Sequence, residues 1–269
     1  MRINIRHSTI YRYDHPVRFS AQYLRLTPYT NPSQRVLNWR IDAPGEQTPW
    51  TDGYGNLCHT LFCDEGFNEI HITAGGTVET TDTGGVLLHE TGLPIGVFLR
   101  GTPLTRIDDS VRKFARPFHE EVGKNRLEAL HGLAKKLADK VEYREDGTDV
   151  HSTAADVLKD GFGVCQDMAH LFIACARSLG VPARYVSGYL YTGEVDSPHV
   201  ASHAWAAGWV DGLGWVSFDV ANKICGTECH VGLAAALDYA GAQPVRGIRQ
   251  GGGMDEMMEV QVQVSAAQA

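Results

Sequence analysis

The sequence has no run of 18 apolar residues, the length at which an apolar stretch indicates a membrane-spanning helix. Its first residues, MRINIRHSTIYRYDHPVRF, lack the apolar core of a secretion signal, so we expect a cytoplasmic protein. Basic residues do not cluster, and 24 Lys and Arg are outnumbered by 32 Asp and Glu, which gives a net charge of −8. These absences argue against nucleic acid and membrane surfaces as partners.

The sequence also lacks the CxxC spacing that is typical of zinc sites. Two short groups could still contribute ligands, Cys58 and Cys63 with His59, and Cys225 and Cys229 with His230. Each would need further ligands from distant parts of the chain. Without an export signal disulfides are also disfavoured, so we expect free thiols and neither a metal nor another cofactor. The six cysteines are Cys58, Cys63, Cys165, Cys175, Cys225 and Cys229.

The chain changes character near residue 100. Before it, apolar and polar residues alternate in several stretches separated by turn-forming segments, which predicts an antiparallel β-domain over residues 1–100 with one face exposed to water. The alternating stretches are 3–13, 35–43, 56–63 and 68–80, and the turn segments are 27–33, 43–49 and 52–56. Residues 87–105 read as a connection. At 269 residues the chain is long enough for one large or two small domains.

Helical patterns begin the second part, residues 101–269. Residues 125–141 carry an apolar stripe of leucines, 108–118 form a shorter pattern, and 152–160 predict a helix capped by Ser152 or Thr153. Residues 255–265 alternate again and predict a closing strand. The whole is therefore predicted to be an α+β protein.

The stretch GFGVCQDMAH, residues 161–170, places a cysteine where a glycine-containing segment turns into a helix. Cys165 falls in the first helical turn, where unpartnered N–H groups and the helix dipole favour an anion and hence a thiolate. Cys175 instead falls within the apolar stripe of the same helix, so we expect it to be a core residue. Cys165 is the candidate nucleophile.

Two later strands supply a candidate base and a group to orient it. His203 opens HAWAAGWV and Asp219 closes WVSFDV, and residue 211, inside the intervening turn, lies midway between them. A hairpin centred there would bring the two side chains nearly opposite on one face, because their separation is even.

Other interpretations of these positions stay open. His203 could be a core histidine beside Trp205 and Trp209, and Asp219 could merely cap a turn. Asn222 could be the orienting group in place of Asp219. The remaining residues nearby are expected to be less important: His199 lies in a loop, His170 on the face of the cysteine helix, and Asp211 in the turn.

The segments GVCQDMAHLFIACARSLGVPARYVSGYL and ASHAWAAGWVDGLGWVSFDVAN strongly resemble the bacterial transglutaminase-like superfamily. The start, MRINIRHSTIYRYDHPVRFSAQYLRLTP, resembles the β-region that precedes this core in one bacterial branch. The resemblance implies a papain-like cysteine-enzyme fold. It also implies that Cys165 is the nucleophile, His203 the base and Asp219 the third member of a triad.

Supporting roles also follow from the resemblance. Tyr143 is a candidate oxyanion donor from the family's usual spacing, with Gln166 and Asn222 as further supporting residues. One departure is visible, since this chain reads DVAN where relatives often read DPTN, so that Val220 replaces a proline. This change leaves the three triad positions intact.

We therefore predict a cysteine-dependent hydrolase of amide or peptide bonds, acting through a thioester on a peptide or small amide substrate. A transglutaminase that passes the acyl group to an amine is the first alternative. A catalytically idle peptide-binding module and a zinc-dependent enzyme using Cys225, Cys229 and His230 are the others. The sequence predicts no oligomeric state.

Overall fold

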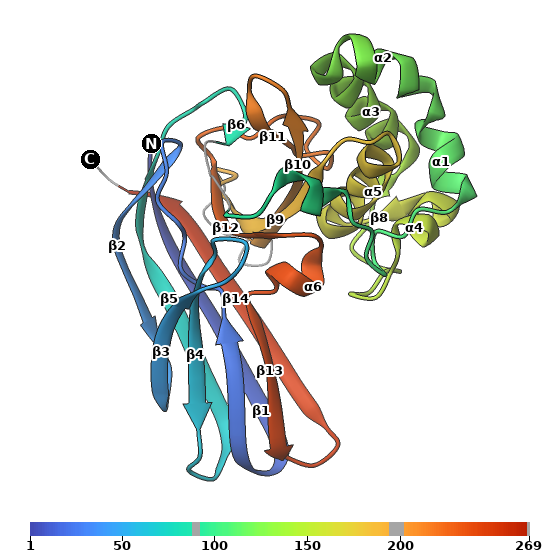
Figure 1. The fold of residues 1–269 in the computed structure, drawn as a ribbon. Coiled ribbons are helices and arrows are strands. Elements are labelled where there is room, and N and C mark those ends of the chain that lie inside the picture. Colours follow the sequence, from blue (N-terminus) through green and yellow to red (C-terminus); the bar gives the residue numbers. More distant parts are fainter. Residues whose placement is uncertain (88–91, 194–201, 268–269) are drawn as a thin grey trace.

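The computed structural model describes residues 1–87, 92–193 and 202–267 of the chain. Two antiparallel sheets and a group of helices make up the fold, with one short parallel strand pair (Figure 1). The predicted α+β class is confirmed. Within the described residues, no helix combines the length and apolar character needed to cross a membrane.

The first sheet is built around the long strand β1 (Arg2–Leu24). Its odd-numbered residues from Ile3 to Tyr13 are buried and face the core, which follows from the two-residue period of a strand. The other strands from the first part of the chain give the order β2-β5-β1-β4-β3. They are β2 (Gln34–Asp42), β3 (Glu46–Thr51), β4 (Leu57–Cys63) and β5 (Phe67–Thr80).

Strand β3 corrects the expectation that residues 43–49 form only a turn. Glu46 to Thr51 pair with β4 in an antiparallel register, and Pro49 lies opposite His59. Proline has no N–H to donate, so it disfavours the interior of a sheet, but β3 is the outermost strand and leaves one side unpaired. The edge position therefore allows a strand in a segment of turn-forming composition.

The closing strand predicted at residues 255–265 is present as β14 (Glu256–Ala266), but it joins the first sheet. Both β14 and β13 (Val245–Gly251) pair with β1, and Figure 1 shows these red strands beside the blue β1. Conversely, β6 (Val86–Leu87) pairs with a strand of the second sheet. The change of pattern near residue 100 therefore does not separate the two sheets, because alternation predicts a strand and its buried face but not its partner.

The second sheet has the order β12-β9-β10-β11-β6. Its strands are β9 (Ala183–Leu190), β10 (Ser202–Val210), β11 (Gly214–Phe218) and β12 (His230–Ala236). Two short strands, β7 (Glu142–Tyr143) and β8 (Phe162–Gly163), form the parallel pair.

The helices gather beside the second sheet (Figure 1). The α-helices are α1 (Asp109–Ala115), α2 (His119–Lys124), α3 (Arg126–Lys140), α4 (Ala154–Asp160), α5 (Cys165–Ser178) and α6 (Tyr239–Ala242), with 3-10 turns at Ile95–Leu99 and Arg116–Phe118. The helices predicted over 125–141 and 152–160 are thus present. Thr153, one of the two capping candidates, accepts a hydrogen bond from the Asp156 N–H at 3.3 Å.

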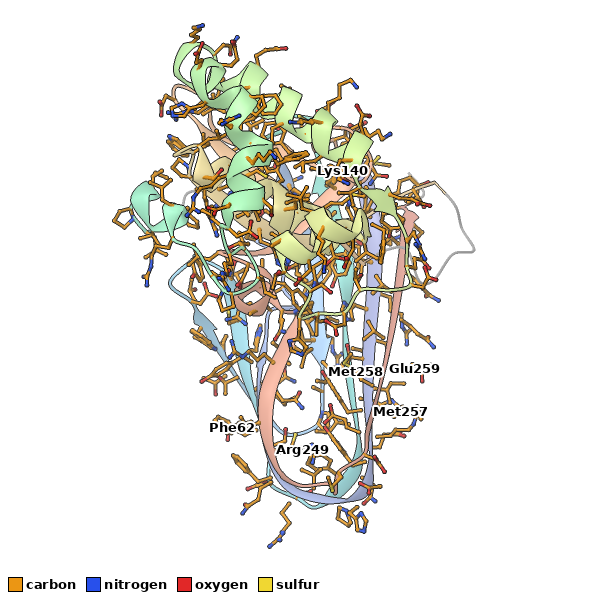
Figure 2. All side chains as sticks on the ribbon, turned by 90° about the vertical axis from the view of Figure 1, so that its right-hand side faces the viewer. Phe62, Lys140, Arg249, Met257, Met258 and Glu259 are labelled. Atoms are coloured by element: carbon orange, nitrogen blue, oxygen red, sulfur yellow. The ribbon has the colours of Figure 1, made fainter. Side chains whose placement is uncertain are left out.

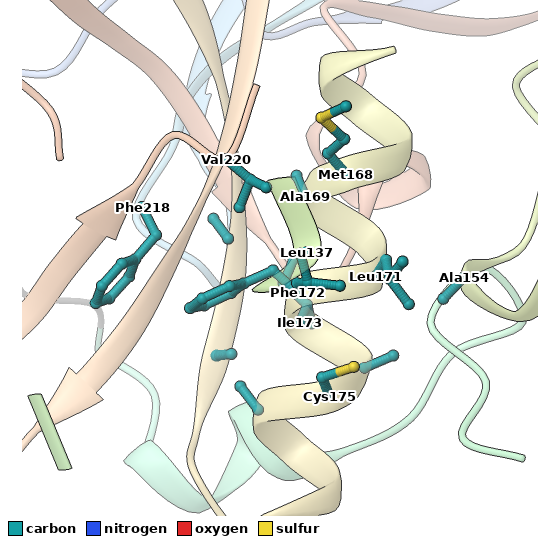
Figure 3. Close-up of a cluster of buried hydrophobic side chains, with 14 of the residues drawn as sticks. Leu137, Ala154, Met168, Ala169, Leu171, Phe172, Ile173, Cys175, Phe218 and Val220 are labelled. Atoms are coloured by element: carbon teal, nitrogen blue, oxygen red, sulfur yellow. The ribbon is translucent and has the colours of Figure 1, made fainter. Parts of the chain in front are cut away.

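Helix α5 is packed into the core along most of its length, since every residue from Asp167 to Arg177 is buried. Phe172 stacks on Phe218 of β11 with ring centroids 4.9 Å apart, and Figure 3 shows it lying between the helix and the sheet. Cys175 is fully buried in the same cluster, as the apolar stripe predicts. Burial of a single such phenylalanine is worth about 1.5–3 kcal/mol, so the start of α5 is held on a rigid support.

The two sheets also pack against each other. Ile3 and Ile5 of β1 belong to one buried cluster with Tyr189 of β9 and with Val231 and Leu233 of β12. This contact brings β1 close to the end of the second sheet where the candidate site lies.

Candidate active site

Two glycines shape the entry to α5. Gly161 ends α4 in the left-handed region at φ 79°, which a side chain would disfavour. At Gly163, a Cβ would lie 2.8 Å from the Cβ of Asp167, so only glycine leaves room for that side chain. Asp167 in turn accepts a hydrogen bond from the Val164 N–H at 2.9 Å. The chain therefore enters the helix with Cys165 as its first residue, where the backbone N–H groups have no partner within the helix.

The hairpin of β10 and β11 differs in register from the prediction. Ala206 pairs with Phe218 and Val210 with Gly214, which centres the hairpin on Gly212 rather than on residue 211. Continuing this register sets Asp219 opposite Trp205, so that His203 is its diagonal neighbour. The two side chains still share a face, and His203 Nε2 lies 2.7 Å from Asp219 Oδ2.

The Asp219 carboxylate is surrounded by donors and fully buried at its side chain. Its Oδ2 accepts hydrogen bonds from His203 Nε2 at 2.7 Å, from Asn222 Nδ2 at 2.8 Å and from His230 Nε2 at 3.0 Å. Burial opposes the ionised form, but these hydrogen bonds outweigh it and hold the pKa of Asp219 well below its usual range. Asp219 is therefore an anion at neutral pH, and Asn222 donates a hydrogen bond to it while also lying 3.3 Å from His203 Nε2.

His203 is correspondingly cationic. Burial alone would lower its pKa, but the hydrogen bonds and negative charges of Asp219 and Cys165 raise it to about 10. The Cys165 thiol is the second hydrogen-bond partner that raises the pKa of His203. The imidazolium therefore lies between a buried carboxylate and the thiol at the start of α5.

His230 is a residue of this site to which the sequence assigned no role outside the zinc alternative. Its Nδ1 accepts a hydrogen bond from the Thr227 N–H at 3.1 Å, so its proton is on Nε2, which donates to Asp219. The sequence offered no direct signal for this contact. Gly188 of β9 pairs with His203 on one side and with Gly232 on the other, and only this strand order brings His230 to the site.

The candidate supporting residues lie near the thiol. Tyr143 is half-exposed on β7, and partial burial together with the charge of nearby Cys165 raises its pKa to about 12. Gln166 lines the same cavity as Cys165 and His203. Tyr143 is therefore close enough for the charge of Cys165 to act on it, and Gln166 shares the cavity of Cys165.

The other histidines considered in this region have different surroundings. His170 is fully buried, its Nε2 accepts a hydrogen bond from the Tyr239 N–H at 3.1 Å, and burial lowers its pKa to about 4. It is therefore a neutral residue on a buried face of α5. His199 lies outside the described residues.

Metal-ligating groups converge in the described part of the chain only at His203, Asp219 and His230, whose ligand atoms lie within 4.8 Å of one another. This set contains neither Cys225 nor Cys229, so the predicted zinc alternative does not assemble around His230. Both histidines direct a protonated Nε2 at the same carboxylate oxygen, which is the arrangement of hydrogen-bond donors around an anion. A cation would have to displace both protons.

Two family models match this chain. Residues 112–220 match the model of the transglutaminase-like superfamily, and residues 3–79 match that of the bacterial transglutaminase-like N-terminal region. The chain is 31% identical to an uncharacterized protein of Mycobacterium tuberculosis, over 98% of this chain and 92% of that protein. An uncharacterized protein of Mycobacterium leprae is 29% identical, over 95% of this chain and 96% of its own length.

The fold has a solved counterpart. The crystal structure of a "putative cysteine protease" from Cytophaga hutchinsonii superposes with a TM-score of 0.78 at 21% sequence identity, and covers 100% of this chain and 91% of that one. At this level of identity the likeness concerns the fold alone. The chain thus belongs to the transglutaminase-like superfamily, and carries the bacterial transglutaminase-like N-terminal region in front of its core.

Proposed function

We propose that this protein is a cysteine-dependent hydrolase of amide or peptide bonds, with Cys165 as nucleophile, His203 as base and acid, and Asp219 as the orienting anion. The observation that carries the proposal is the cationic His203 between the Asp219 carboxylate and the Cys165 thiol. A nucleophile, a base and a group that orients the base are the parts that thiol acyl transfer requires.

The reaction would begin from the thiolate of Cys165 paired with the imidazolium of His203. The sulfur attacks the amide carbonyl carbon, and the C=O π electrons move onto the oxygen. Backbone N–H groups at the start of α5 can donate to this oxyanion, because the first helical turn leaves them unpartnered. Tyr143 and Gln166 are the candidate side-chain donors.

The imidazolium of His203 then gives its proton to the leaving nitrogen, the C–N bond breaks, and a thioester on Cys165 forms. Neutral His203 next takes a proton from water, whose oxygen attacks the thioester carbonyl. The C–S bond breaks, the carboxylic acid leaves, and the thiolate–imidazolium pair is restored. Asp219 stays ionised throughout and keeps the ring oriented.

Hydrolysis is favoured over transfer to an amine by the character of the cavity. Among the described residues that line it, there is no Asp or Glu that could hold a lysine ammonium beside the thioester. Water is far more concentrated than any amine, so transfer would need such a binding feature.

The test uses a panel of peptides and small amides with wild-type protein and Cys165→Ala, followed by mass spectrometry of the products. The expected products are free acid and amine, with no turnover by the variant and a trapped acyl group on Cys165 in rapid quenching. An amide conjugate as the main product in the presence of a millimolar primary amine would favour the transglutaminase alternative. A panel bound by the wild type but never cleaved would favour the peptide-binding module.

We also infer a cytoplasmic location from the cysteines. All six are unpaired, although the fold buries several of them, and this state is typical of a reducing compartment. Fractionation of the producing cell, with thiol labelling of each fraction, tests this inference. Recovery of oxidised protein from outside the cytoplasm would contradict it.

A further inference from the structure

A cavity of about 290 Å³ lies in front of the candidate catalytic pair. Cys165 and His203 line it on the side of the second sheet, together with residues of β9 such as Tyr185. The opposite side comes from the first sheet, through Thr9 of β1 and Val260 of β14. An acyl group attached to the Cys165 sulfur would therefore be held between the two sheets.

The described lining of this cavity carries no Asp, Glu, Lys or Arg. Its histidine on the side of the first sheet, His7, is 2% exposed and lies between two hydroxyl groups, that of Tyr189 at 3.0 Å from Nδ1 and that of Thr9 at 3.1 Å from Nε2. Burial lowers the pKa of His7 to about 4, so it is neutral at neutral pH. Apart from the Cys165–His203 pair itself, the described lining offers a charged substrate group no opposite charge, so its entry would cost hydration without compensation.

The surface of the cavity is mainly apolar and aromatic. Tyr11, Tyr185 and Tyr239 contribute aromatic rings, and Met258 and Val260 contribute apolar side chains from β14. Figure 2 shows Met258 on β14 of the first sheet, away from the helices. This wall of the cavity therefore comes from a sheet that carries none of the triad residues. The volume is at the lower end of the range for ligand sites, roughly 300–1,000 Å³, and suits a single amino-acid side chain or a small acyl group.

We propose that this cavity selects amide substrates whose acyl group bears an uncharged apolar or aromatic side chain, and that β1 and β14 of the first sheet provide this selectivity. The proposal rests on the proposed function, because it assigns the acyl-binding site of the same cysteine.

The test measures alkylation of Cys165 rather than turnover. Three peptidyl chloromethyl ketones that differ only in the side chain next to the reactive carbon, Phe, Asp or Lys, are reacted with the full-length protein. Site-specific mass spectrometry gives each rate at Cys165, and each is divided by the rate with iodoacetamide, which carries no side chain. We expect the Phe reagent to exceed the Asp and Lys reagents by roughly tenfold or more.

A pair of variants on β14 tests the wall itself. Val260 is 37% exposed, so a lysine there can reach water and should not prevent folding. Val260→Lys should raise the relative rate of the Asp reagent several-fold and leave that of the Lys reagent low. Gln261 is exposed and lies on the opposite face of the strand, so Gln261→Lys adds the same charge outside the cavity and should leave all three ratios unchanged.

The possible results separate the two proposals. Equal normalised rates for the three reagents would overturn the proposed selectivity, and so would equal effects of Val260→Lys and Gln261→Lys. In either case, labelling of Cys165 by iodoacetamide would leave the proposed function standing. A Lys reagent that reacts fastest would show that the cavity binds a cation, and would also overturn it. If no reagent, iodoacetamide included, reacts at Cys165 in the folded protein, the proposed function itself fails.

Discussion

Replacing Asp219 by Asn tests the electrostatic basis of the site. The substitution keeps the shape of the side chain and removes its charge. In the structure, Oδ2 accepts three hydrogen bonds, from His203, His230 and Asn222. The amide oxygen of an asparagine could still accept some of these three hydrogen bonds, but it carries no negative charge. If the amide NH₂ faced the imidazoles instead, its N–H groups would point at the N–H groups of the histidines and no hydrogen bond would form.

The size of the effect follows from the loss of a buried, charge-assisted hydrogen bond. Such a bond contributes about 1.5–3 kcal/mol, which corresponds to roughly 10- to 150-fold in rate. Since His203 also loses the anion that keeps its pKa near 10, we expect the upper part of this range for kcat/KM of Asp219→Asn. Asp211→Asn is the matched control, because Asp211 lies on the turn of the same hairpin with its side chain 76% exposed.

The assay is the rate of iodoacetamide alkylation of Cys165 between pH 5 and 10, measured together with kcat/KM. In the wild type, His203 stays protonated to about pH 10, so its positive charge stays beside the Cys165 sulfur over this pH range. In Asp219→Asn the imidazole loses the buried anion that helps to hold its proton, so the alkylation rate relative to the wild type should fall between about pH 7 and 9. An unchanged ratio across this range, or an equal change in Asp211→Asn, would refute the reasoning.

Three further predictions concern the same site. Iodoacetamide should label Cys165 ahead of Cys175, because Cys175 is fully buried and burial raises its pKa to about 12; faster labelling of Cys175 in the folded protein would contradict the assignment. His230→Phe should lower kcat/KM roughly tenfold by removing a donor to Asp219, while His230→Gln, which keeps an N–H donor, should lose less; equal losses in the two variants would reduce His230 to a packing role. The pKa of His203 is raised from 6.5 to about 10, so its stabilising contribution is complete below pH 6.5 and fades as the pH rises toward 10. The melting temperature of the wild type should therefore exceed that of His203→Gln most between about pH 4 and 6.5, and a difference that grows with pH would contradict this.

Much of the local structure was determined by the sequence alone. The apolar periodicity at 125–141 and the alternation at 255–265 predicted a helix and a strand that are both present. The glycines before α5 predicted that the helix begins near Cys165, which places this cysteine in the first helical turn. Gly163 is required at this entry because any larger residue would collide with Asp167. These features depend on neighbours within a few residues, which is the range over which side-chain pattern and backbone preference act.

The tertiary structure decided what depends on distant pairing. Alternation in β14 could not reveal that its partner is β1, more than two hundred residues away, and this pairing gives the cavity its second wall. The hairpin is centred one residue later than predicted because the turn fixes the register by its own geometry, so His203 and Asp219, predicted to be nearly opposite, are diagonal neighbours on one face. His230 reached the carboxylate only through the order of β12, β9 and β10 in the sheet. A sequence pattern specifies which face of a strand is buried, whereas the strand beside it is chosen by the packing of the whole chain.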